Sequence, residues 1–167
     1  MDTVQDIFDQ THYTKVGLPL AECESLPRWC FTSEAFFARE VERIFKRVWN
    51  LVGRIEEVAE PGDYMTVEVV GEPLIIMRDE GGSLHAFANA CQHRGAQLLD
   101  GTGNCKRAIL CPYHGWAFAT DGRLIGAAGM ERTSDFDMAD WGLAEIRLEG
   151  WAGFMFVCFD QAAIDLM

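Results

Sequence analysis

Two short segments that carry metal-ligating side chains constrain the fold of this chain most. Residues 91–95 read CQHRG and residues 111–116 read CPYHGW, so a C-x-H motif is followed by a C-x2-H motif. Thiolate and imidazole are soft or borderline ligands that suit zinc, copper and iron. Four such ligands in two short motifs predict loops that meet at one metal site. Any fold for this chain has to bring the two loops together.

The ligand set is compatible with two kinds of metal site. Two Cys and two His suit a tetrahedral zinc ion, and they also suit a [2Fe-2S] cluster in which His replaces Cys on one iron. In the C-x-H motif the two side chains lie two positions apart, so each short loop can reach both irons. Gly95, Gly115 and Pro112 favour tight turns whose backbone N–H groups point at bridging sulfides, which a zinc ion does not need. These features favour the cluster, with structural zinc as the alternative.

The two motifs together resemble the Rieske iron–sulfur motif of the Rieske non-haem iron oxygenases, in the form found in aromatic-ring-hydroxylating α-subunits. The resemblance implies a Rieske-type [2Fe-2S] cluster, with Cys91 and Cys111 on one iron and His93 and His114 on the other. It also implies a mainly β fold: a Rieske-type β-sandwich or small barrel with a cluster-binding subdomain, preceded by one N-terminal α-helix.

Further residues of the motifs are expected to surround the cluster: Arg94, Gly95, Tyr113, Gly115 and Trp116. We expect Tyr113 and Trp116 to shield it from water, and Arg94 either to pair with an acidic group or to remain an exposed charge. Respiratory-chain Rieske proteins, which the motif also resembles, carry a disulfide and a Ser that donates to a bridging sulfide. Here Ala96, Tyr113 and Trp116 occupy those positions. Fewer donors predict a reduction potential near the low end of the Rieske range, about −150 mV.

The chain is predicted to form one domain behind an N-terminal arm. Residues 1–32 are polar and irregular and are interpreted as the arm, and residues 33–167 as a single Rieske domain. From Thr32 or Ser33, either of which suits an N-cap, apolar residues recur at helical spacing, which predicts a helix over 33–49.

Short apolar runs between turn signals predict the β structure that follows the helix. The expected strands lie near 49–53, 64–70, 73–78, 84–89, 108–111, 116–119, 123–126, 143–149 and 153–159. Both ligand motifs then fall in loops at one tip of the domain. We interpret residues 101–103 as a turn, and residues 127–141 as an acidic surface insertion that forms a loop or a short helical turn.

Composition limits the class of partner. A net charge of −12 argues against nucleic acid as a partner, because phosphate contacts need clustered Lys and Arg. No apolar run reaches the length of a membrane span, and the acidic start differs from a signal peptide, so we expect a cytoplasmic protein. Apart from the two motif cysteines, the cysteines show no framework spacing and are interpreted as free thiols: Cys23, Cys30, Cys105 and Cys158.

Two functions compete. In the first, the chain is the N-terminal part of an oxygenase terminal component, which takes electrons from a ferredoxin or flavin reductase. It passes them to an O2-activating mononuclear iron in a catalytic non-haem iron domain. In the second, the chain is a free-standing Rieske ferredoxin-like electron carrier. The helix and the arm favour the first function, because simple Rieske ferredoxins resemble only the part from about residue 50 onward.

A catalytic iron site is not expected within this chain. The family holds that iron with two His and a carboxylate, the ligand set that suits O2 activation. Once His93 and His114 are assigned, only His12 and His85 remain, without the family's D-x2-H-x4-H pattern. We expect His85 to be a half-buried strand residue. The resemblance therefore leaves open whether the chain is itself an enzyme, and it implies a homotrimer only where the catalytic domain is present.

Overall fold

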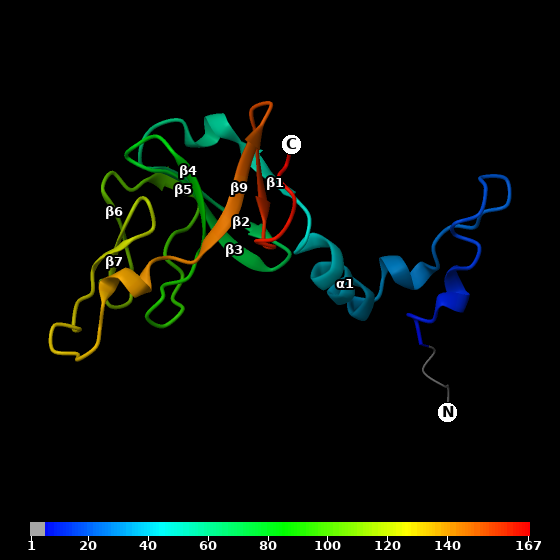
Figure 1. The fold of residues 1–167 in the computed structure, drawn as a ribbon, viewed down its shortest axis with the longest axis horizontal. Helices are drawn as coiled ribbons and strands as arrows, with labels where there is room; N and C mark the ends of the chain where they lie inside the picture. The colour runs from blue at the N-terminus through cyan, green and yellow to red at the C-terminus, as the bar shows by residue number, and fades with distance from the viewer. Residues whose placement is uncertain (1–5) are drawn as a thin grey trace. The chain divides into compact units, whose positions relative to one another are not determined.

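A computed structural model describes residues 6–167 (Figure 1). Contacts along the chain divide it into two compact units, the first ending at Lys46 and the second running from Arg47 to Met167. This division differs from the predicted boundary after residue 32, because the helix that begins at Glu34 contacts the helical turns on either side of it. The limits of the functional domain stay a prediction.

The first unit consists of short helical segments. They are 3₁₀ helices η1 (Gln10–Tyr13) and η2 (Arg28–Phe31), helix α1 (Glu34–Glu40) and the π-helical turn η3 (Val41–Phe45). Ser33 caps α1, because its side chain accepts a hydrogen bond from the Phe36 N–H at 3.3 Å. Of the two predicted caps, Thr32 and Ser33, the structure has Ser33. The predicted helix end near residue 49 is wrong. Trp49 instead belongs to the second unit, where its indole N–H donates to the Ile164 carbonyl at 3.0 Å.

The second unit is built on a seven-stranded antiparallel sheet. Its strand order is β1-β10-β9-β4-β3-β2-β5. The strands are β1 (Asn50–Arg54), β2 (Asp63–Val69), β3 (Glu72–Arg78), β4 (Leu84–Ala88), β5 (Thr102–Asn104), β9 (Glu145–Trp151) and β10 (Phe154–Cys158), with 3₁₀ helix η4 (Ile55–Val58) after β1. The mainly β fold class is confirmed, and all nine predicted strands are present. The sequence missed β5, an exposed three-residue edge strand with no apolar alternation, where only a turn was expected.

A small three-stranded sheet completes the second unit. It has the order β6-β7-β8, with β6 (Ala108–Leu110), β7 (Ala117–Ala119) and β8 (Leu124–Gly126). The insertion that follows ends in 3₁₀ helix η5 (Met138–Trp141), which agrees with the predicted helical turn. Figure 1 shows β6 and β7 at one end of the second unit, away from β1.

Strand β3 separates two apolar cores, because successive side chains of a strand point to opposite faces. Ile75 and Met77 join one core, and Leu74 and Ile76 join the other. The first core also contains Cys91 and Cys111, so the ligand motifs rest on a packed interior. Among residues 6–167 the structure has no disulfide, in agreement with the predicted free thiols, and no helix long and apolar enough to span a bilayer.

Candidate metal centre

The two motifs form loops with the same backbone turn. We call residues 91–96 the first ligand loop and residues 111–116 the second ligand loop. In the first, the Cys91 N–H donates to the Ala96 carbonyl and the Gly95 N–H donates to the Cys91 carbonyl, each at 2.8 Å. In the second, the Cys111 N–H donates to the Trp116 carbonyl at 2.8 Å and the Gly115 N–H to the Cys111 carbonyl at 3.1 Å. Each loop therefore has its Cys at the first position and its Gly at the fifth.

The fifth position of each loop requires glycine for its backbone conformation. Gly95 has φ +67° and Gly115 has φ +73°, in the left-handed region that side chains with a Cβ rarely adopt. A Cβ added at either position would meet no atom within 4 Å. The predicted tight turns are confirmed, and their requirement is conformational rather than steric.

The two cysteine sulfurs lie together beneath the loops. Cys91 and Cys111 are both buried, and their thiols are hydrogen-bonded to each other. Each sulfur also receives two backbone N–H groups of its own loop, at residues 93 and 94 for Cys91 and at residues 113 and 114 for Cys111. These donors are placed to stabilise negative charge on sulfur.

Burial and hydrogen bonding act in opposite directions on the two thiols. Burial raises the pKa of Cys91 above its ordinary value, and the backbone donors only reduce that rise. Burial also acts to raise the pKa of Cys111, but there the donors outweigh it and the pKa lies below its ordinary value.

The two histidines of the motifs also meet. The ring centroids of His93 and His114 are 4.7 Å apart, with the ring planes at 63°. The Nδ1 atom of His93 is buried and has no hydrogen-bond partner. Burial, followed by the proximity of His114 and Arg94, holds the pKa of His93 below its ordinary value. A neutral imidazole with a buried, unpartnered nitrogen is chemically suited to bind a metal.

The four side chains form a sulfur pair and an imidazole pair, each with one member from each loop. Within residues 6–167, no group of three or more His, Cys, Asp or Glu side chains is arranged to hold a single metal ion. Separate pairs of sulfur and nitrogen ligands fit a cluster with two chemically different irons. The residues present therefore fit a [2Fe-2S] group with mixed ligands.

Trp116 shields the imidazole pair on one side. It is 1% exposed, and its ring stacks on His93 with centroids 4.8 Å apart and planes at 7°. Phe136 and Trp141 pack edge-on against the other parts of the indole, at 5.7 and 5.8 Å. This packing covers the His93 ring, and the shielding of a cluster by Trp116 stays a prediction.

Tyr113 and Arg94 lie on the outer side of the loops. The Tyr113 ring is 61% exposed and lies 3.8 Å from the His114 ring, so it covers only part of that imidazole. Arg94 is exposed, and no carboxylate of residues 6–167 forms an ion pair with it. Both predicted roles of Arg94 stay predictions.

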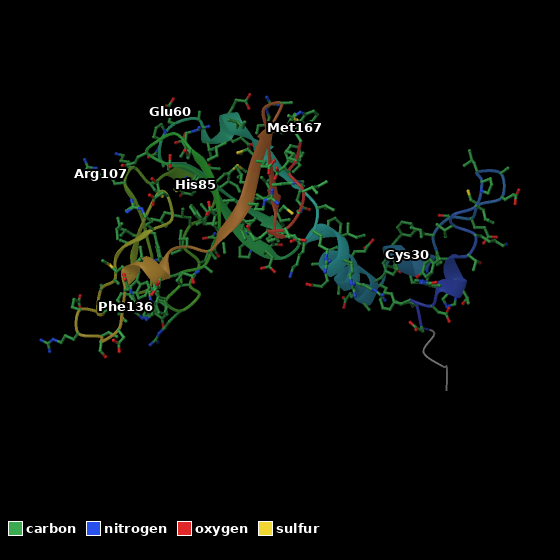
Figure 2. The ribbon with its side chains drawn as sticks, in the orientation of Figure 1. Cys30, Glu60, His85, Arg107, Phe136 and Met167 are labelled. Atoms are coloured by element: carbon green, nitrogen blue, oxygen red, sulfur yellow. The ribbon has the colours of Figure 1, made fainter. Side chains whose placement is uncertain are left out.

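Two contributors to this region escaped the sequence analysis. The insertion at 127–141 was predicted to be surface only, which is wrong for Phe136 (labelled in Figure 2). Phe136 packs on Trp116 and on the first core. The aromatic residues within this acidic segment were the available signal. Asn89, two positions before Cys91, is 2% exposed and binds the backbone at residues 98 and 99. Asn is so common at strand ends that its position gave no signal.

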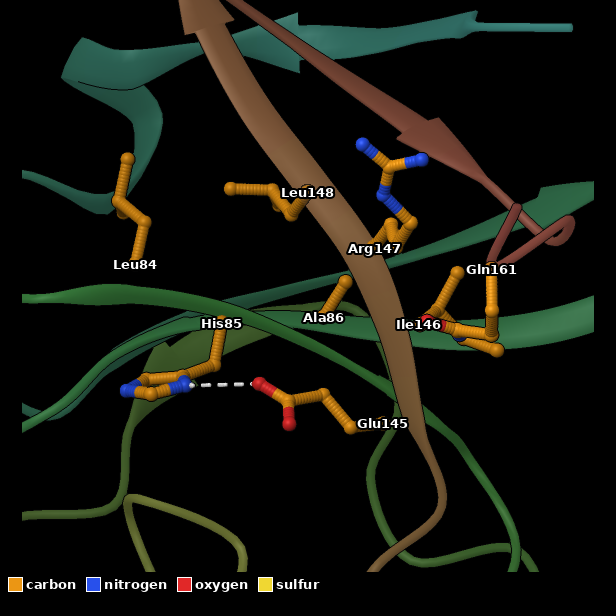
Figure 3. Close-up of a pocket in the computed structure, with 8 residues that line it drawn as sticks. All are labelled: Leu84, His85, Ala86, Glu145, Ile146, Arg147, Leu148 and Gln161. Atoms are coloured by element: carbon orange, nitrogen blue, oxygen red, sulfur yellow. Dashed lines mark ion pairs between the residues drawn. The ribbon is translucent and has the colours of Figure 1, made fainter. Parts of the chain in front are cut away.

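His85 lies on β4 and is half-buried, as predicted. Its Nε2 is 3.0 Å from Asp79 Oδ2. Its Nδ1 is 3.5 Å from Glu145 Oε1, the ion pair drawn in Figure 3. It borders a cavity of about 280 Å³ between β4 and β9 that Arg147 also lines. The carboxylates lie on opposite sides of the imidazole, so the three side chains do not converge on one point.

Comparison with known proteins places the two loops in a wider context. Residues 48–138 match the Rieske [2Fe-2S] domain family. The carnitine monooxygenase oxygenase subunit of Escherichia coli is 40% identical over 142 residues, which are 85% of this chain and 38% of that protein. The chloroplastic choline monooxygenase of Beta vulgaris is 33% identical over 161 residues, which are 96% of this chain and 36% of that protein.

The fold of this chain also has a counterpart among solved structures. The apo form of CntA, a quaternary ammonium Rieske monooxygenase, aligns with a TM-score of 0.83 and 38% identity, over 86% of this chain and 42% of that one. The chain thus spans well under half the length of the relatives that it matches.

Proposed function

Because the chain belongs to the Rieske [2Fe-2S] domain family, we propose that Cys91 and Cys111 bind one iron of its cluster and that His93 and His114 bind the other. The observation that carries this proposal is the pairing of side chains across the two loops. The His93 and His114 rings lie 4.7 Å apart, and the two buried thiols are close enough for each to shift the pKa of the other. The unpartnered Nδ1 of His93 supports it further, because a buried polar atom without a partner is costly unless a ligand satisfies it.

When bound, a cluster of this kind stores and releases one electron at a time, at potentials set by its ligands and by hydrogen bonds to sulfur. The chain supplies the backbone N–H groups at residues 93, 94, 113 and 114, which donate to the cysteine sulfurs. Trp116 excludes water from the His93 side, whereas Tyr113 leaves the His114 side partly open. Because no hydroxyl of Ser or second pair of Cys lies in these loops, we expect a potential near the low end of the Rieske range, about −150 mV.

This electron transfer serves an oxygenase in our proposal. The electron donor is a ferredoxin or a flavin reductase, and the acceptor is an O2-activating mononuclear iron in a catalytic non-haem iron domain. Support comes from the homologous oxygenase subunits, of which the chain covers 38% or less in the two sequence matches. The match to choline monooxygenase covers 96% of the chain, so it extends into the helical unit before β1. A free-standing Rieske ferredoxin-like carrier, the alternative, needs no such unit.

The finer expectations remain part of the proposal. Aromatic ring hydroxylation, which the motif predicts, is one candidate activity, and the three relatives described above are instead named as carnitine, choline and quaternary ammonium monooxygenases. A quaternary ammonium substrate is therefore a second candidate, which depends on residues outside this chain. A cytoplasmic location, and a homotrimer where the catalytic domain is present, are likewise proposed.

A chimera tests the oxygenase role. This chain replaces the homologous part of the E. coli carnitine monooxygenase oxygenase subunit, and carnitine oxidation is measured with that enzyme's reductase. We expect turnover that is abolished by Cys91→Ser, the matched control. A chimera that loads both metal centres but does not turn over would favour the independent carrier.

A further inference from the structure

Asn89 is one of only two buried polar or charged side chains in the described part of the chain, and all of its hydrogen bonds go to backbone. Its Oδ1 accepts from the N–H groups of Leu98 and Leu99, each at 3.0 Å, and its Nδ2 donates to the Leu99 carbonyl at 2.8 Å. Its own N–H donates to the Pro73 carbonyl at 2.8 Å, which continues the pairing of β4 with β3. The side chain thus joins the end of β4 to a segment nine and ten residues further along.

The segment that Asn89 spans contains the whole first ligand loop. The chain leaves β4 at Asn89 and returns to its side chain at Leu98, and Cys91 and His93 lie in between. After the loop, residues 97–100 are not in a strand, and β5 pairs with β2 rather than with β4. No ladder of backbone hydrogen bonds therefore holds the outgoing leg of this loop against the incoming leg.

The second ligand loop has the backbone ladder that the first ligand loop lacks. It closes the β6–β7 hairpin, in which Leu110 pairs with Ala117 and Ile109 pairs with Phe118 directly below the loop. A ladder of backbone hydrogen bonds therefore joins the two ends of the second loop. At the first loop, the three hydrogen bonds of the Asn89 side chain join the two ends of the loop, as the β6–β7 ladder does in the hairpin.

We propose that Asn89 is the positioning residue of the first ligand loop, and that it holds Cys91 and His93 in register with Cys111 and His114 for cluster binding. The inference rests on the ligand set proposed above. Only an amide of this length accepts from two successive N–H groups while donating to the carbonyl next to them. Without it, the N–H groups of Leu98 and Leu99 lose their partners, and the Leu99 carbonyl keeps only the Gln97 Nε2 donor. The outgoing leg must then move to satisfy these groups.

A variant series on the full chain tests this role. Asn89→Ala removes all three bonds, and Asn89→Asp keeps the acceptor but loses the donor. Asn104→Ala is the matched control, because Asn104 also makes three hydrogen bonds: its Nδ2 donates to the Pro61 carbonyl and to Asp63 Oδ1, and its Oδ1 accepts from the Lys106 N–H. Val157→Ala, at a fully buried site of the other core, controls for a general loss of stability.

The readouts are cluster loss under chelator challenge, followed by absorbance, and the EPR spectrum of the reduced protein. For Asn89→Ala we expect cluster loss about 10-fold to 100-fold faster, the range found for residues that orient metal ligands, and a broadened spectrum. Asn89→Asp should fall between Asn89→Ala and the parent. Asn104→Ala and Val157→Ala should keep the parent rate and spectrum, even where Val157→Ala melts as early as Asn89→Ala.

The outcomes separate this inference from the proposed ligand set. Cluster loss and a spectrum unchanged in Asn89→Ala, or changed equally in Val157→Ala, would overturn the positioning role. If Asn89→Ala does not fold, the same comparison is made with Asn89→Asp. A parent chain without a Rieske EPR signal would instead overturn the ligand assignment itself.

Discussion

The first and second ligand loops share one backbone turn but differ in what surrounds it. Both carry Cys at the first position and a left-handed Gly at the fifth. The His is third in the first loop and fourth in the second, and the sixth position is Ala96 in one and Trp116 in the other. A strand ladder supports the second loop, whereas one buried amide supports the first.

This difference shows that the residues that form each turn are separate from the residues that place the two turns beside each other. The turn depends on residues within six positions of one another, so it can be repeated wherever Cys and Gly have this spacing. The relative placement of the turns depends on the hairpin in one case and on Asn89 in the other. The two loops should therefore respond alike to substitutions within the turn and differently to substitutions in their surroundings.

The largest effect on cluster binding is expected at the first position of each loop, where both loops have Cys. Cys91→Ser and Cys111→Ser each remove a thiolate from the same proposed iron, and a hydroxyl is a far poorer ligand for it. Both variants should lose the cluster altogether, which iron and sulfide analysis of the purified proteins would show. Retention of a full cluster by either one would break the assumed equivalence of the loops.

A large and unequal effect is expected at the sixth position. Trp116→Ala gives the second loop the residue that the first loop has, and it empties a site that is 1% exposed. The loss of stability should be about 3–5 kcal/mol, as for other buried aromatic residues. Denaturant unfolding measures it, and a loss below about 1 kcal/mol would contradict the packing of Trp116 against His93, Phe136 and Trp141.

Gly95→Ala and Gly115→Ala should have moderate and nearly equal effects. Both glycines have positive φ and open space around the missing Cβ, so each substitution carries only the cost of a left-handed residue, about 1–2 kcal/mol. Gly122→Ala provides the contrast, because its Cβ would lie 2.5 Å from Phe87 Cε1. Equal losses at all three glycines in thermal unfolding would disagree with this distinction.

The smallest effect concerns the strand that leads into the first loop. Burial acts to raise the pKa of Asp79, but hydrogen bonds from His85 and from the Ser83 N–H outweigh it, so the pKa lies below its ordinary value. The carboxylate therefore stabilises the fold above pH about 3.8, and this contribution disappears as pH falls through the lower folded pKa. Asp79→Asn should cost about 1–2 kcal/mol near neutral pH and nothing at pH values below both pKa values.

The pH dependence should also distinguish the two loops. Asp79 and His85 hold β4, whose end carries Asn89 and the first ligand loop. As the pH is lowered, the protection of backbone amides against hydrogen exchange should therefore fall in residues 91–97 before it falls in residues 112–116. Simultaneous loss of protection in both segments would show that β4 does not favour one loop over the other.

Much of this site could be predicted because its signals are local. The spacing of Cys91, His93, Cys111 and His114 indicated two meeting loops, and the nine strands followed from apolar alternation between turns. Asn89 could not be assigned, because its partners are backbone groups nine and ten residues away whose position depends on the completed fold. Phe136 and β5 were missed for related reasons, since one packs across the chain and the other is exposed at an edge.

Cys91 and Cys111 are proposed to bind one iron of the cluster, and His93 and His114 the other iron of the same cluster. Nitrogen hyperfine spectroscopy of the reduced chain tests this assignment most directly, because it counts the imidazoles bound to the cluster. We predict two coupled nitrogens in the parent, and one in His114→Cys together with a lower reduction potential, since the new thiolate adds negative charge. A parent chain that contains zinc and shows no such signal, or a His114→Cys variant that keeps both nitrogens, would contradict the assignment.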